Sequence, residues 1–234
     1  MDIISKVSLM KHKNLILISV LSLLACGLHA AMLNSPFNGY LYTSILKVVV
    51  FILFPLICFA VSKSGSFKDL IFLKGEKKYI KICLFLGIFV FAFILTVFIL
   101  FNKFFDKMMI VDGMSEIGIT KTTYPLVFIY IILINSALEE LFFRGFAFLT
   151  LYKLGYKRYA YIFSSLLFAG YHMAVLDGWF SIGIFILCIA GLVAVGLIFN
   201  EFAKRCRTIL GSFLLHVSAN LAINLIGAYY FYLA

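Results

Sequence analysis

The segment that decides the fold covers residues 124–152 and reads YPLVFIYIILINSALEELFFRGFAFLTLY. It is long and apolar enough for a helix to cross a bilayer, whose hydrocarbon core of roughly 30 Å needs about 20 helical residues. It nevertheless contains Glu139, Glu140 and Arg144. A charge at the centre of a membrane helix costs about 2.5–3.5 kcal/mol, so such residues usually face the bundle interior, pair with one another and serve a function.

The composition of the whole chain agrees with a membrane protein. Of its 234 residues, 64% are hydrophobic and only 13% are charged, whereas a soluble domain carries about 25% charged residues. The net charge of +10 does not indicate a nucleic-acid partner, because the lysines and arginines stand in short runs between apolar segments, as they do in cytoplasmic loops. The five cysteines are scattered without a CxxC pair, which argues against a zinc knot or a disulfide framework.

Seven apolar segments have lengths suited to membrane spans. They are too long and too uniformly apolar for barrel strands, so we expect helices. The first segment is too long for a typical signal-peptide core and is interpreted as an uncleaved helix. The sequence therefore predicts an all-α, polytopic transmembrane helix bundle that forms a single domain over residues 1–234, with spans near 15–33, 42–62, 80–102, 124–152, 159–176, 179–200 and 208–232.

The charges outside these segments predict the orientation of the bundle. Basic residues are in excess at the N-terminus and in every second loop, and the loops between these are uncharged, balanced or carry a single aspartate. The positive-inside rule then places the N-terminus inside the cell and the C-terminus outside. The compact chain and its lysine-rich loops favour a bacterial cytoplasmic membrane. The basic loops are 63–79, 153–158 and 201–207.

Two further spans carry polar residues that lipid would not favour. The fifth span contains His172, one turn after Phe168, and the seventh contains His216 and Asn220 at i and i+4. Counted from the predicted cytoplasmic ends, these residues and Glu140 lie roughly 12–20 Å deep at 1.5 Å per residue. Three helices thus place costly polar groups in one layer of the bilayer, which favours a shared site.

The spacing within the fourth span suggests different roles for its charges. Glu140 and Arg144 are i and i+4, so they share a helix face and are placed to form an ion pair. Glu139 is rotated about 100° from Glu140 and is free to point elsewhere. Gly145 follows and permits a close approach of another helix.

A buried carboxylate beside a histidine is suited to activating water as a general base. His216 and Asn220 would supply hydrogen-bond donors to a developing oxyanion. Metal assistance is a second route, because Glu139, His172 and His216 match a known type of zinc ligand set. Asparagine is a poor zinc ligand, however, and the HExxH motif is absent. Both routes remain open, and no serine, threonine or cysteine stands in a nucleophile motif.

Three motifs in these spans resemble those of the CPBP family, which comprises CAAX-processing proteases and bacteriocin-processing enzymes and is also called the Abi family. The family patterns are EExxxR, FxxxH and HxxxN. They are matched in order by EELFFR at 139–144, FAGYH at 168–172 and HVSAN at 216–220. The resemblance covers residues 124–222, and the first three spans carry no matching motif.

The resemblance implies an all-helical membrane bundle with a peptidase site open to the cytoplasmic half. It implies that Glu139 activates water with help from His172, and that His216 and Asn220 stabilise the oxyanion. Glu140 and Arg144 would position the site. The family has been described both as metal-dependent, which would make Zn²⁺ a possible cofactor here, and as using a glutamate mechanism.

The expected function is therefore that of an intramembrane endopeptidase. Its partners would be the lipid bilayer and a membrane-associated or lipidated peptide or protein, such as a CAAX-type, pheromone or bacteriocin precursor. A transporter or proton relay is an alternative, since buried glutamates and histidines also serve pumps. A non-catalytic immunity or scaffold protein with the same bundle is another. His12 and His29 are expected to be incidental residues without partners. The oligomeric state is not predicted.

Overall fold

A computed structural model describes residues 3–62, 70, 75–176 and 180–233. Of the described residues 88% are helical and none is in a strand. Within them, seven helical stretches are long and apolar enough to cross a membrane, which confirms the predicted all-α polytopic bundle. The charges at 63–69 and 71–74, and Asp177, which contributed to the predicted orientation, lie outside the described residues. The spans are α1 (Ile3–Leu33), α2 (Tyr40–Ser62), α4 (Lys77–Phe101), the fourth span (Tyr124–Lys153), α9 (Lys157–Leu176), α10 (Ile182–Cys206) and α11 (Leu210–Tyr232).

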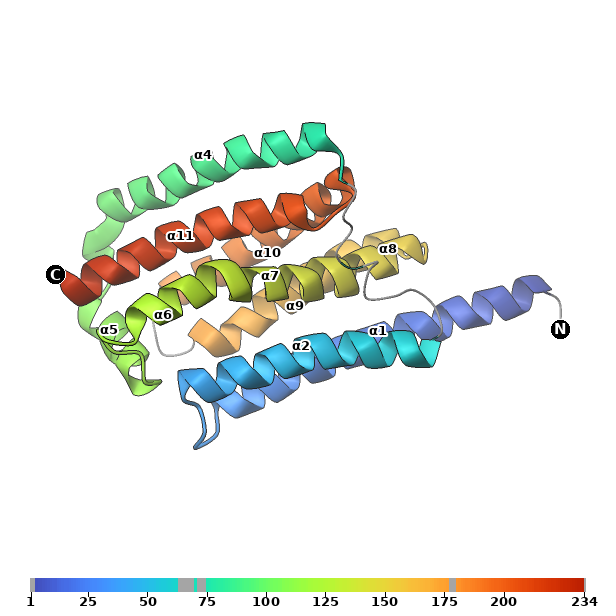
Figure 1. Ribbon diagram of the computed structural model, residues 1–234, viewed down its shortest axis with the longest axis horizontal. Helices are drawn as coiled ribbons and strands as arrows, with labels where there is room; N and C mark the ends of the chain where they lie inside the picture. The colour runs from blue at the N-terminus through green and yellow to red at the C-terminus, as the bar shows by residue number, and fades with distance from the viewer. Residues whose placement is uncertain (1–2, 63–69, 71–74, 177–179, 234) are drawn as a thin grey trace.

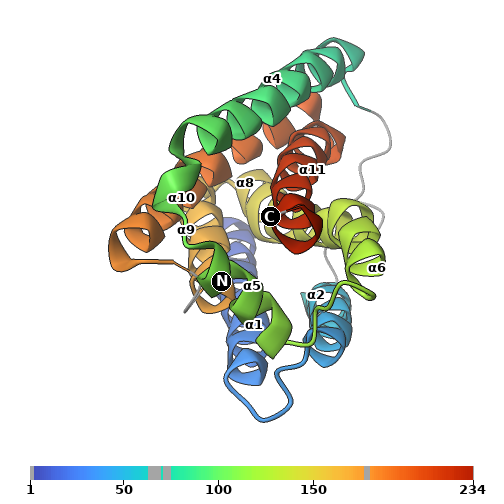
Figure 2. The same ribbon diagram turned by 90° about the vertical axis from the view of Figure 1, so that its left-hand side faces the viewer.

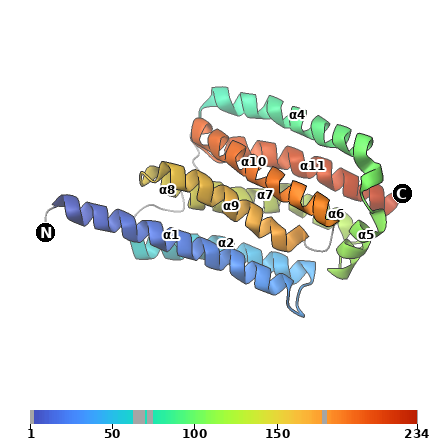
Figure 3. The same ribbon diagram turned by 180° about the vertical axis from the view of Figure 1, so that it is seen from behind.

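The helices run roughly side by side, and the two termini lie at opposite ends of the bundle (Figure 1). Seen end-on, α4 and the pair α1 and α2 form opposite sides, with the other spans between them (Figure 2). The view from behind shows α9 and α10 next to each other, with α1 below them (Figure 3). The fourth span therefore passes through the interior, where its polar side chains are shielded from lipid.

An aromatic core surrounds the fourth span. Phe142 and Phe143 are fully buried. The ring of Phe51 on α2 stacks on Phe142 with 4.0 Å between centres, and Phe168 on α9 lies edge-on to Phe143 at 5.3 Å. In lipid such packing acts mainly through dispersion, because there is no hydrophobic driving force between helices. These contacts hold α2 and α9 against the part of the fourth span that carries the acidic pair.

The fourth span departs from regular α-helix around its charged residues. It runs through α6 (Tyr124–Ile129), η2 (Tyr130–Asn135), α7 (Ser136–Glu139), η3 (Glu140–Thr150) and α8 (Leu151–Lys153), and both η2 and η3 are π-helical. Hydroxyl groups follow the wider turn: Ser136 Oγ donates to the carbonyl of Ile131 and Thr150 Oγ1 to that of Gly145, each five residues back. Such turns are rare and frequently mark functional sites.

A polar clamp joins η3, α9 and α10. Ser164 Oγ donates to the carbonyl of Phe143 at 2.8 Å, and the Asn200 amide donates to Ser165 Oγ at 3.2 Å. Gly196 lies one turn before Asn200, and a Cβ built on it would be 3.0 Å from the Cα of Ser165. The absence of a side chain at Gly196 therefore allows the two backbones to approach closely, and this fixes α9 beside the charged segment.

Two predicted loops are partly helical, and one helix extends beyond the span predicted in it. Residues 103–123 contain the helix α5 (Lys107–Glu116), whose N-terminus is capped when Asp106 accepts from the amide of Met109. The predicted loop 201–207 belongs mostly to α10, because Glu201 pairs with basic residues one turn ahead. The helix that contains the predicted first span 15–33 extends beyond it and begins at Ile3. Hydropathy locates the lipid-facing part of a helix and misses its polar ends.

Candidate active site

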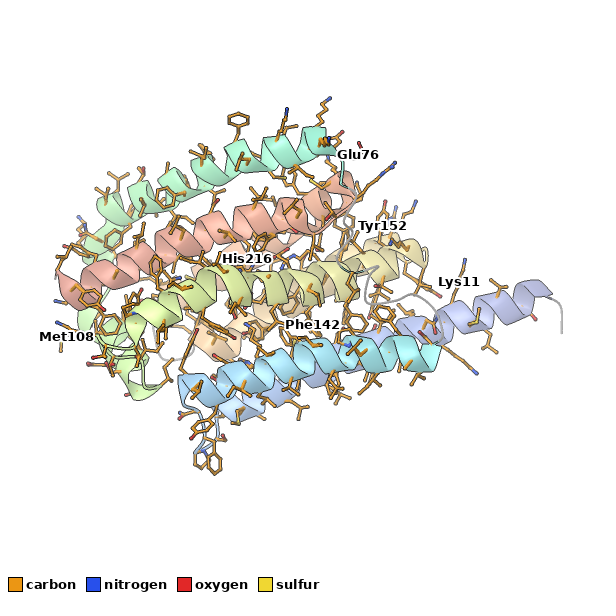
Figure 4. All side chains as sticks on the ribbon, viewed as in Figure 1. Lys11, Glu76, Met108, Phe142, Tyr152 and His216 are labelled. Carbon is orange, nitrogen blue, oxygen red and sulfur yellow. The ribbon has the colours of Figure 1, made fainter. Side chains whose placement is uncertain are left out.

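The structure brings five of the six predicted site residues into one cluster. Glu139 ends α7 and Glu140 begins η3, His172 comes from α9 and His216 from α11. Figure 4 places His216 on the interior side of α11, towards the fourth span. Both glutamates and His216 are buried, and the side chain of His172 is 18% exposed. The three helices therefore converge at one depth, as the residue counts predicted.

Glu140 is held from two directions. Its Oε1 is 3.2 Å from Nη1 of Arg144 and 2.8 Å from Nδ1 of His216. A carboxylate only accepts hydrogen bonds, so the His216 Nδ1–H must be the donor. Glu140 thereby joins η3 to α11 and fixes the orientation of the imidazole of His216.

The guanidinium of Arg144 is enclosed by aromatic rings. It is fully buried, and its central carbon is 4.1 Å from the ring centre of Phe168 and 4.9 Å from that of Phe199. Cation–π contacts of this kind stabilise a desolvated cation by about 2 kcal/mol. They give a physical reason for the phenylalanine that precedes His172 by one turn, because this ring covers the arginine of the first motif.

The two oxygens of Glu139 have different surroundings. Oε1 accepts from Nζ of Lys47 at 2.5 Å and from the amide of Asn135 at 3.1 Å. Oε2 faces Nε2 of His172 at 3.8 Å and Nε2 of His216 at 3.6 Å. Among the described residues it has no hydrogen-bond partner. One oxygen is thus anchored while the other points at two imidazole nitrogens.

The orientation of His172 is set by its own helix. Its Nδ1 lies 2.8 Å from the carbonyl oxygen of Phe168, which can only accept, so Nδ1 carries the proton. In the neutral ring Nε2 is then an acceptor, and it faces another acceptor, Oε2 of Glu139, at 3.8 Å. Two acceptors that face each other in this way can be bridged only by a group that donates to both.

Asn220 lies outside this set of contacts. Its Nδ2 donates to Oγ of Ser136 at 2.9 Å, and Ser136 is one turn before Glu140 on the fourth span. The next turn of α11 continues the polar row, because Asn224 donates to the carbonyl of Asn220 at 2.8 Å. The structure therefore places the predicted oxyanion donor beside the acidic pair along the span, and gives it a partner that the sequence motif did not indicate.

Lys47 on α2 is the main site residue that sequence reasoning missed. It is buried and bonds to Glu139 and also to Asn135. A lysine inside the apolar span 42–62 is as costly to bury as the charges of the fourth span. This cost alone marks Lys47 in the sequence as a candidate functional residue. No motif of the family resemblance includes the second span, so the motifs do not indicate Lys47.

The expectation that His12 and His29 lack partners needs correction. His12 Nδ1 is 2.7 Å from the hydroxyl of Tyr156. His29 is buried with its ring centre 5.1 Å from that of Tyr171, and Tyr171 also lies beneath the ammonium of Lys47. His29 thus belongs to the wall of the polar cluster, although its Nδ1 has no hydrogen-bond partner in the described part of the chain.

The assignment of Glu139, His172 and His216 as zinc ligands stays a prediction. Among the described residues, no three histidine, cysteine, aspartate or glutamate side chains are grouped so as to hold a metal ion. The charges of the cluster already balance, since the two carboxylates are paired with Lys47 and Arg144.

Comparison with known proteins finds a family model that is similar to the segment carrying this site. Residues 121–222 match the family model "Type II CAAX prenyl endopeptidase Rce1-like". This segment is 102 of the 234 residues, so the similarity covers less than half of the chain. The matched segment contains all three motifs and all six predicted site residues, and Lys47 lies outside it. No curated protein and no solved structure matches the chain.

Proposed function

We propose that this protein is an intramembrane endopeptidase that hydrolyses a peptide bond with water activated by Glu139. The observation that carries the proposal is the pair of acceptors formed by Glu139 Oε2 and His172 Nε2, which face each other at 3.8 Å. A water hydrogen-bonded to both would have its oxygen directed away from them, towards a bound peptide. The family match supports the reaction class.

In the proposed reaction, the water oxygen attacks the carbonyl carbon of the scissile bond as Glu139 takes up one proton. The negative charge moves to the carbonyl oxygen, and the C–O bond to water forms. Collapse of this intermediate breaks the C–N bond, and the proton held by Glu139 passes to the leaving amine. Glu139 is thereby returned to its carboxylate form, as a general acid–base group requires.

We assign stabilisation of the oxyanion to His216 and Asn220. Since His216 Nδ1 donates to Glu140, its Nε2 donates to substrate only when the ring is doubly protonated. That imidazolium would lie between Glu139 and Glu140, whose carboxylates stabilise its charge. Asn220 would turn its amide from Ser136 to the substrate. Glu140 and Arg144 are positioning residues. Glu140 holds the imidazole of His216, and Arg144 packs against the aromatic rings around it.

We propose that the substrate is a peptide or protein held at the membrane, of the CAAX, pheromone or bacteriocin-precursor type. Such a substrate reaches a buried site by lateral movement in the bilayer. We also propose that the N-terminal end of the bundle faces the cytoplasm of a bacterial cell. Lys11, Glu76 and Tyr152 mark this end in Figure 4, and Met108 marks the other.

The test is cleavage of membrane-associated peptides by the purified protein in liposomes, with Glu139→Gln as the central variant. The peptide panel includes a farnesylated CAAX peptide and the same peptide without the lipid. We expect the wild type to cleave at least one peptide and Glu139→Gln to lose cleavage while keeping its melting temperature. Activity should survive a chelator, and metal analysis should find no stoichiometric zinc.

Three results would contradict the proposal. Undiminished cleavage by Glu139→Gln would remove the assigned base. Loss of cleavage after chelation, restored by Zn²⁺, would support the metal route instead. Ion flux across liposomes that depends on Glu139, with no peptide cleaved, would favour a transporter or proton relay.

A further inference from the structure

Lys47 introduces a charged side chain into the site from a helix outside the matched segment 121–222. It lies on α2, and its ammonium bonds to Oε1 of Glu139, 92 residues further along the chain, at 2.5 Å. The same ammonium bonds to Oδ1 of Asn135, whose own amide donates to Oε1 of Glu139 at 3.1 Å. Lys47, Asn135 and Glu139 therefore form a closed triangle of hydrogen bonds.

The surroundings of Lys47 are built to hold its ammonium in one place. It is 4.7 Å from the ring centre of Tyr171 and 5.6 Å from that of Phe51. Both rings belong to the aromatic core, since Phe51 stacks on Phe142 and Tyr171 contacts Phe143. These contacts offset part of the cost of a desolvated cation.

The triangle has a consequence for the carboxylate. The last torsion of a glutamate side chain rotates broadly when nothing holds it. Two donors on Oε1 prevent that rotation, and the remaining oxygen is directed at the imidazole nitrogens of His172 and His216, 3.8 Å and 3.6 Å away. Without Lys47, Glu139 would keep one donor from Asn135, and its two oxygens would exchange positions more easily.

We infer that Lys47 is a positioning residue that fixes which oxygen of Glu139 serves as the base. This inference rests on the proposed function. A purely structural ion pair is the competing explanation, because breaking a buried pair leaves an uncompensated charge and destabilises a fold whatever its activity. The two explanations differ in whether the turnover number falls without a corresponding loss of folded protein.

The test compares Lys47→Met and Lys47→Arg with the wild type in the liposome cleavage assay, using the peptide that the wild type cleaves. We expect Lys47→Met to lower kcat about 100-fold, the size of loss that follows a small misplacement of a reacting group, with KM almost unchanged. Lys47→Arg keeps the charge and a donor and should recover part of kcat. It also covers the case in which Lys47→Met does not fold.

Val50→Ala is the matched control, because Val50 is on the same helix and is as buried as Lys47. It should lower the melting temperature and leave kcat unchanged. A second readout does not need activity: Lys47→Met/Glu139→Gln should melt higher than Lys47→Met alone, because the double variant leaves no unpaired carboxylate.

The outcomes separate this inference from the proposed function. If folded Lys47→Met keeps the wild-type kcat while Glu139→Gln loses cleavage, the positioning role of Lys47 is overturned and the proposed function stands. An equal fall of kcat in Val50→Ala at an equal loss of melting temperature also overturns it. Undiminished cleavage in Glu139→Gln overturns both ideas together.

Discussion

The guanidinium of Arg144 lies 4.1 Å from the ring centre of Phe168, so the last residue of one motif is covered by the first residue of the next. The contact links η3 to α9, and His172 follows Phe168 by one turn on the same helix face. The ring of Phe168 is also 4.5 Å from that of His172. The motifs therefore describe one packed unit as well as a set of polar groups.

Replacement of Phe168 by leucine should uncover the cation. We expect a loss of stability of about 2 kcal/mol from the cation–π contact, together with reduced cleavage because the imidazole of His172 loses its support. Thermal unfolding in detergent measures the stability, and the liposome assay measures the cleavage. Phe85→Leu is the control, since Phe85 on α4 is 71% exposed, and it should leave both properties unchanged. Equal effects of the two substitutions would contradict a special role for Phe168.

Replacement of Arg144 by methionine should destabilise the protein by about 3–5 kcal/mol, because it leaves the buried carboxylate of Glu140 without its neighbouring cation. The double variant Arg144→Met/Glu140→Gln should recover much of this loss, since it contains neither charge. Chemical unfolding of the purified variants measures both values. Arg205→Met, at the partly exposed pair with Glu201, should have little effect. A double variant less stable than Arg144→Met would show that the two residues do not act as a pair.

Substitution at Asn220 separates a donor to the oxyanion from a helix contact. Removal of one oxyanion donor typically lowers kcat about 10²–10³-fold, so we expect a loss of that size in Asn220→Ala. Ser136→Ala removes only the acceptor that Asn220 now uses and should lower kcat much less. If Ser136→Ala lowers kcat as much as Asn220→Ala does, the role of Asn220 is to hold α11 against α7.

The sequence predicted the parts of this site that depend on local spacing or on the cost of burial. The i and i+4 pairing of Glu140 with Arg144 is present, and the spans of His172 and His216 meet the fourth span as the depth count required. The pairing of Lys47 with Glu139 could not be read from spacing, because it depends on how α2 packs against the fourth span. The same holds for the partner of Asn220. The π-helical turns also escaped prediction, because an assumed 3.6-residue period excludes them.

The predicted orientation can be checked with cysteines placed at the two ends of the bundle. Lys11 and Glu116 are exposed, and the positive-inside rule places Lys11 in the cytoplasm and Glu116 outside. A membrane-impermeant maleimide should label Glu116→Cys on intact cells and Lys11→Cys only after permeabilisation, in a background without the native cysteines. The reverse pattern would show that the bundle is inserted with its N-terminus outside.

Two glycines of α10 test whether the close approach of α9 and α10 supports the site. A Cβ on Gly196 would meet Ser165 at 3.0 Å, whereas one on Gly191 would meet nothing within 4 Å. Gly196→Ala should therefore cost about 1–3 kcal/mol through overpacking, and it should lower cleavage by displacing the polar clamp around Asn200. Gly191→Ala should be neutral or stabilising by about 0.5–1 kcal/mol, because alanine favours helix. Thermal unfolding and the liposome assay measure both variants, and equal stability and cleavage in the two would show that the clamp tolerates a wider separation of the helices.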